Sequence, residues 1–134
     1  MKQIFKNIGI VILGIIIGMI VNMGLIIVGG MIVPLSENIN PMNAINLDFK
    51  YFIFPFLAHS IGTLSGSFIV SKISKNSHII MPLIVGLYFL SGGLYMATIL
   101  PAPTWFISLD VVLCYIPMAL FGWKISKQVS GLSA

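Results

Sequence analysis

The chain has 134 residues, of which 58% are hydrophobic and 7% are charged, and its mean hydropathy is +1.09. These values lie far outside the range of soluble globular domains and predict an integral membrane protein. Seven lysines and three acids give a net charge of +4. Because the lysines stand in short groups beside apolar runs, membrane topology accounts for them, and we expect a lipid bilayer and no nucleic acid as partner.

Four apolar runs follow one another, each long enough to cross a hydrocarbon core about 30 Å thick. Runs of this length must satisfy their backbone hydrogen bonds internally, which predicts an all-α fold. Short links between the later runs predict neighbours that are antiparallel, in a single four-helix transmembrane domain over residues 1–134. Pro117 has no amide proton for the carbonyl of Leu113, so a bend is expected near Cys114. The runs cover residues 8–33, 51–71, 79–99 and 106–123.

The lysines also predict the orientation of the bundle. Six of them precede the first run, separate the second from the third or follow the fourth, and only Lys50 lies at the other end. By the positive-inside rule both termini are cytoplasmic and residues 34–50 form an external loop, whose Asn, Pro and Ser content favours turns. The first run is longer than that of a signal peptide and is interpreted as a retained span. We expect a multi-pass protein of the cell membrane.

Small residues recur every four positions on the first two runs. Gly14 and Gly18 lie on one face of the first run, and Gly62 and Gly66 lie on one face of the second. Such faces let two helix backbones approach closely, so we predict that these runs cross there. The same feature supports a first functional hypothesis, a non-enzymatic membrane protein that packs with itself or serves as a small subunit of a larger membrane complex.

Several polar residues are expected in the half of the bundle next to the external loop. Counted inward at ~1.5 Å per residue, Asp110 lies about 6 Å deep, His59 and Ser91 about 12 Å, and Asn22 about 17 Å. Ionisable groups at such depths usually face a partner or water, which makes His59 and Asp110 a candidate pair. They support a second hypothesis, a small transporter or proton-coupled conduit. The candidate polar cavity consists of Asn22, His59, Thr63, Ser91 and Asp110.

Each of these groups also has a purely structural interpretation. His59 could bond a serine or a backbone carbonyl of a neighbouring helix, and Asn22 could join two helices. Asp110 could cap the start of the fourth run or lie among lipid headgroups. The two hypotheses differ in whether these side chains converge on a cavity or are each satisfied at a helix contact.

The motifs of several enzyme and cofactor classes are incomplete. A single cysteine, Cys114, excludes an internal disulfide. Two histidines and one buried acid on different runs do not make a metal-ligand motif, and a haem would need a second histidine at the depth of His59, so no metal or cofactor is expected. The LSG segments at 64–66 and 90–92 lack the first glycine of the rhomboid-protease GxSG motif. Whether the protein is an enzyme stays open.

Three segments, FPFLAHSIGTLSG, LPAPTWFISLD and YIPMA, resemble parts of a group of small, uncharacterised four-span bacterial membrane proteins. The resemblance covers most of the second to fourth runs. The group has no known activity or site to carry over, and the resemblance implies only a location in the bacterial cytoplasmic membrane.

Overall fold

The computed structural model describes residues 1–74 and 78–131. Over these ranges the chain is helical and contains no strand, and four segments are long and apolar enough to cross a membrane. The prediction of an all-α protein with four transmembrane helices is confirmed. The elements are α1 (Lys2–Ile32), the 3-10 helix η1 (Pro41–Asn46), α2 (Lys50–Ser74), α3 (Ile80–Ile99), α4 (Thr104–Leu113) and α5 (Ile116–Val129), the last two forming one span.

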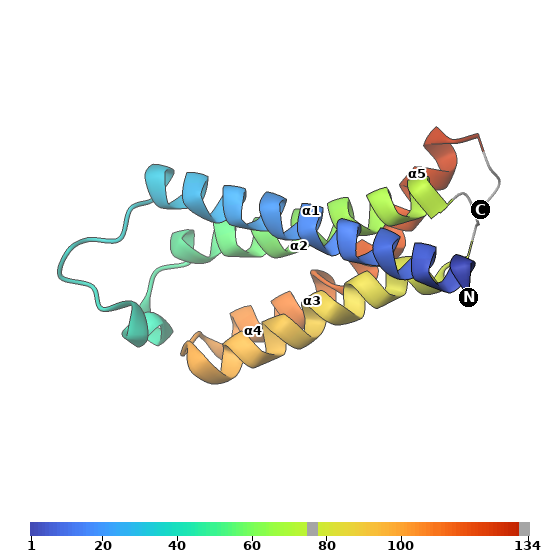
Figure 1. Ribbon diagram of the computed structural model, residues 1–134. Coiled ribbons are helices and arrows are strands. Elements are labelled where there is room, and N and C mark those ends of the chain that lie inside the picture. The colour runs from blue at the N-terminus through green and yellow to red at the C-terminus, as the bar shows by residue number, and fades with distance from the viewer. Residues whose placement is uncertain (75–77, 132–134) are drawn as a thin grey trace.

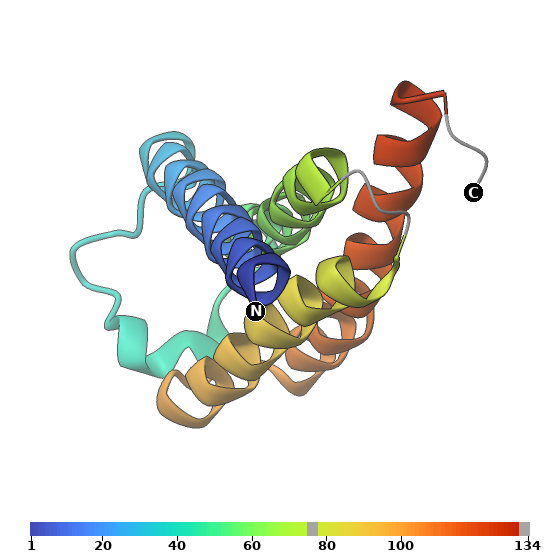
Figure 2. The ribbon, with the colours of Figure 1, turned by 45° about the vertical axis from the view of Figure 1, so that its right-hand side comes forward.

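Successive spans run in opposite directions, as Figure 1 shows. Helices α1 and α3 run toward the end at which residues 33–49 and 100–103 connect the spans, which we call the loop end. Helix α2 and the α4–α5 span run away from it, toward what we call the terminal end, where the N-terminus lies. Figures 1 and 2 both place α1 beside α2, with α3 and the α4–α5 span completing the bundle.

Glycines bring α1 and α2 into backbone contact. A Cβ atom added at Gly66 would lie 2.6 Å from the carbonyl oxygen of Gly14, and one added at Gly62 would lie 2.9 Å from that of Gly18. No larger side chain fits at these separations without moving the helices apart. The small-residue face of α1 therefore packs against that of α2 within the same chain.

The fourth span is broken in the middle. Helix α4 ends at Leu113 and α5 begins at Ile116, and Tyr115 between them has φ −112° and ψ −79°. Pro117, in the first turn of α5, provides no amide proton for the carbonyl of Leu113. The predicted bend near Cys114 is confirmed, and it turns the span at the level of the polar residues described below.

The terminal half of the bundle is closely packed by small residues. The Ser67 hydroxyl donates to the carbonyl of Ala119 on α5 at 2.5 Å. A Cβ atom added at Gly122 would lie 2.5 Å from the carbonyl oxygen of Leu64, and one added at Gly86 would lie 2.7 Å from the Cβ of Ala119. This packing joins α2, α3 and α5 below the break in the fourth span.

Labelling with a membrane-impermeant thiol reagent tests the predicted orientation. Met42 in η1 is exposed at the loop end, Lys124 in α5 is exposed near the terminal end, and the native Cys114 is buried. With cytoplasmic termini, Met42→Cys should react in intact cells and Lys124→Cys only after permeabilisation. The reverse pattern would overturn the orientation. Lys75, another lysine of the charge bias, lies outside the described residues.

Candidate functional site

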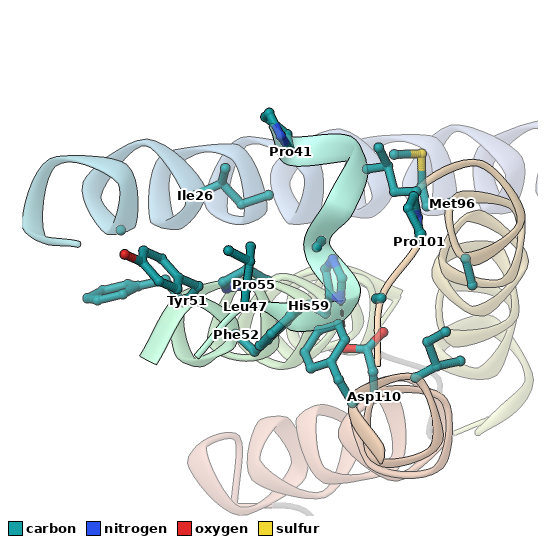
Figure 3. A pocket seen from close by; sticks show the side chains of 18 of the residues that line it. Ile26, Pro41, Leu47, Tyr51, Phe52, Pro55, His59, Met96, Pro101 and Asp110 are labelled. Carbon is teal, nitrogen blue, oxygen red and sulfur yellow. Dashed lines mark hydrogen bonds and ion pairs between the residues drawn. The ribbon is translucent and has the colours of Figure 1, made fainter. Parts of the chain in front are cut away.

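The loop half of the bundle contains a cavity of about 420 Å³, bounded by all four spans and by the segment that includes η1 (Figure 3). This volume is in the range of small-molecule sites, about 300–1,000 Å³. Its walls are largely apolar and partly aromatic. Residues that line it include Ile26, Phe52, Phe54, Met96, Phe106 and Ile107.

His59 and Asp110 meet on the wall of this cavity. Nδ1 of His59 lies 2.7 Å from Oδ1 of Asp110, and the Tyr115 hydroxyl donates to Oδ2 at 2.7 Å. The same hydroxyl oxygen lies 3.2 Å from Nδ1, and the two rings stack with centroids 5.9 Å apart. The carboxylate thus receives one donor on each oxygen, from side chains on α2 and on the fourth span.

The carboxylate determines the tautomer of His59. An ionised carboxylate can only accept hydrogen bonds, so Nδ1 carries the proton in this contact. In the neutral ring Nε2 is then an acceptor, and no described residue donates to it. The His59 side chain keeps 24% of its surface exposed, against 7% for Asp110. Figure 3 shows the His59 ring with one edge turned to Asp110, and the partly exposed ring is part of the cavity lining, so Nε2 is the ring nitrogen left for a ligand.

Local backbone features hold the three side chains in place. Thr63, one turn beyond His59, donates to the His59 carbonyl at 2.8 Å and is fully buried. The break after Leu113 brings Tyr115 back toward Asp110, five residues earlier in the chain. On α3, Gly93 leaves room for the Tyr115 hydroxyl, since a Cβ atom there would collide with it. The site therefore depends on three spans.

Tyr115 was not among the residues expected from the sequence. In an unbroken helix, positions five apart do not face each other, so Asp110 and Tyr115 would not have been paired. One feature of the sequence could have identified Tyr115. Its side chain carries a hydroxyl and stands two residues before Pro117, where a bend is predicted.

Asp110 does not cap the fourth span. That span starts at Thr104, and Asp110 lies in the last turn of α4, buried within the bundle. The capping interpretation of Asp110 is wrong, because the helix begins at Thr104 and the carboxylate is bonded to His59 and Tyr115.

Three of the expected cavity residues lie elsewhere. Thr63 lies one turn beyond His59 on α2 and is buried in the protein interior. Asn22 packs against Gly62 at the α1–α2 contact. Ser91 is exposed and donates to the carbonyl of Tyr88, one turn back on α3. None of the three lines the cavity described above. Depth along a span had placed them near His59, but the face that each helix turns inward depends on its contacts with the other helices.

The electrostatics of the cavity are simple. Among the described residues that line it, Asp110 is the sole acid. Lys50 lies toward the loop end, exposed, with Nζ 5.1 Å from the centroid of the Tyr51 ring. No described cluster of three or more His, Cys, Asp or Glu side chains could hold a metal ion.

Replacing Tyr115 by phenylalanine should lower the stability of the fold. The change removes a buried hydroxyl that donates to a carboxylate, a contact worth about 1 to 3 kcal/mol of unfolding free energy. Tyr88→Phe is the matched control, because Tyr88 is exposed and its hydroxyl lies 3.9 Å from the Met19 sulfur. Thermal unfolding in detergent measures both, and equal midpoints would contradict the role assigned to Tyr115.

No protein-family model matches the chain, and comparisons with curated proteins and with solved structures found no match. The function is therefore argued from the geometry of the site.

Proposed function

We propose that the chain is a small membrane carrier whose substrate site is the loop-end cavity. One observation supports this most strongly: His59 and Asp110, on different spans, meet on the wall of an apolar cavity inside a membrane-spanning bundle. Ionisable side chains within spans are costly to insert and are usually found at substrate or ion sites. Helix packing alone does not require a partly exposed imidazole whose Nε2 has no partner among the described residues.

The competing hypothesis of a packing subunit loses its main argument. It rests on small-residue helix faces and on the small extramembrane mass of the chain, and those faces are used between α1 and α2. Gly14, Gly18, Gly62 and Gly66 all lie in that intramolecular contact. A partner chain would have to use other surfaces.

A carrier fits the packing better than an open conduit. The cavity lies in the loop half, whereas α2, α3 and α5 are closely packed below it, so a bound molecule could not continue without a rearrangement. The break between α4 and α5 lies beside Asp110, and Pro117 has no amide proton to donate to the carbonyl of Leu113 across it, so we place the rearrangement there. With the termini in the cytoplasm of a bacterial cell, the cavity would load from the outside.

Photolabelling tests whether the cavity binds a small molecule. A short alkyl diazirine ending in a hydroxyl, added to protein in lipid nanodiscs, should label buried wall residues such as Phe52 and Phe106. Ala97→Phe fills part of the cavity and should reduce this labelling, whereas Leu94→Phe, on the exposed side of the same helix, should not. Labelling confined to lipid-facing residues, or insensitive to Ala97→Phe, would refute the proposal.

A further inference from the structure

We infer that the ligand of the cavity is a lipophilic amine in its protonated form, with its N–H directed at the His59–Asp110 pair. This inference rests on the proposed function and names the substrate class. Three features of the site support it: the charge of Asp110, the free lone pair of His59 and the apolar walls.

While the His59 ring is neutral, Asp110 has no counter-charge in contact with it in the described part of the chain. Asp110 is 5% exposed and accepts hydrogen bonds from the Tyr115 hydroxyl and from Nδ1 of His59, whose ring carries a charge only when Nε2 is also protonated. No lysine among the described residues forms an ion pair with it, and Lys50 remains exposed toward the loop end. A buried charge without a counter-charge is strongly unfavourable, so the cavity favours a cation over a neutral molecule or an anion.

The vacant position is a hydrogen-bond acceptor. With its Nδ1 proton engaged by Asp110, His59 offers the lone pair of Nε2 to the cavity, and an ammonium N–H is a strong donor to it. A quaternary ammonium has no N–H and could not make this bond. An anionic ligand at the His59–Asp110 pair would meet the field of Asp110, because Lys50, the lysine among the described lining residues, lies at the start of α2, toward the loop end.

The walls suit an apolar body beside the cationic head. Phe52, Tyr51 and Phe106 contribute aromatic rings to the lining. Ring faces attract cations, and the aliphatic side chains around them exclude water from the rest of the ligand. The expected ligand is thus a small hydrocarbon-bodied amine.

A proton competes with this ligand. A proton on Nε2 occupies the same lone pair as the ligand N–H, and the resulting imidazolium cancels the charge of Asp110, so binding should weaken as the pH falls. The titratable groups around His59 are Asp110, Cys114 and Tyr115 from the fourth span and Lys50 and Tyr51 from α2. The described lining residues of α1, α3 and η1 include none.

Two photolabels of equal length, one ending in a primary amine and the other in a hydroxyl, test the inference. We expect the amine to saturate the cavity residues at a concentration at least about tenfold lower than the alcohol, as one charge-assisted hydrogen bond would give. Asp110→Asn should abolish this preference, and Asp48→Asn, in the exposed loop, should keep it. Alcohol labelling of the cavity in each variant reports that the site is folded.

The pH dependence of the wild-type protein provides a measurement that needs no variant. The preference for the amine should decline as the pH is lowered, because a proton on Nε2 removes the acceptor while the aliphatic amine stays protonated. Equal labelling by amine and alcohol at every pH, or a preference that survives Asp110→Asn, would overturn the amine inference and leave the binding function standing. Failure of both labels to reach the cavity would overturn the proposed function itself.

Discussion

Replacing Gly62 and Gly66 together by leucine is expected to disrupt the α1–α2 contact. Cβ atoms at these positions would lie 2.9 and 2.6 Å from backbone carbonyl oxygens of α1, and backbone cannot move aside as the tip of a flexible side chain can. Overpacking costs about 1 to 3 kcal/mol per site, so we expect a loss of about 2 to 6 kcal/mol in unfolding free energy. The thermal midpoint in detergent should fall accordingly.

The chain offers a matched control for this change. Gly9 and Gly24 lie in α1 with no atom within 4 Å of an added Cβ. Leucine at both should be neutral or slightly stabilising, because leucine has the higher helix propensity. If the two double variants unfold at the same temperature, the glycine contact does not hold these helices together.

Replacing His59 by asparagine is expected to remove the pH dependence of ligand binding without abolishing binding. The asparagine amide can donate to Asp110 and its oxygen can accept from a ligand, but it cannot acquire a charge in this pH range. At the acidic end of the pH range in which both proteins stay folded, the variant should therefore bind the amine photolabel at least about tenfold better than the wild-type protein does. Saturation of cavity labelling across the pH range measures this effect.

His78 supplies the control for that experiment. It is exposed and lies just before α3, in the terminal half of the bundle. His78→Asn should bind the amine with the wild-type pH dependence. A pH dependence that persists in His59→Asn and disappears in His78→Asn would assign the proton to the wrong histidine and refute the competition mechanism.

Local patterns along the sequence predicted much of the fold. Apolar runs define the spans because a bilayer requires each crossing segment to be helical and hydrophobic. Pro117 predicted the break in the fourth span because its missing amide proton acts on the same helix. Gly14 and Gly18 on α1 are four residues apart, as are Gly62 and Gly66 on α2. This spacing can be recognised in each run alone, and it predicts a close helix contact.

The rest of the site depends on how the helices rotate and pack. Residue counting gave the depths of Ser91 and Asn22 but not the direction in which α3 and α1 turn them, which is set by contacts between spans. Tyr115 reaches Asp110 because of the angle of the helix break and because Gly93 has no side chain in the space that the Tyr115 hydroxyl occupies. The cavity itself exists because the segment with η1 lies against the spans, and the composition of that loop predicted turns without predicting their position.

The measurement that tests the central proposal most directly is nitrogen NMR of the histidine rings, with and without the amine. The chain contains two histidines, His59 and His78, so a histidine-labelled sample gives few signals, and His78→Asn assigns them. We predict that free His59 carries its proton on Nδ1, and that adding the amine shifts the His59 Nε2 resonance while leaving His78 unchanged. A His59 ring protonated on Nε2 in its neutral form, or a spectrum unaltered by saturating amine, would contradict a substrate site at the His59–Asp110 pair.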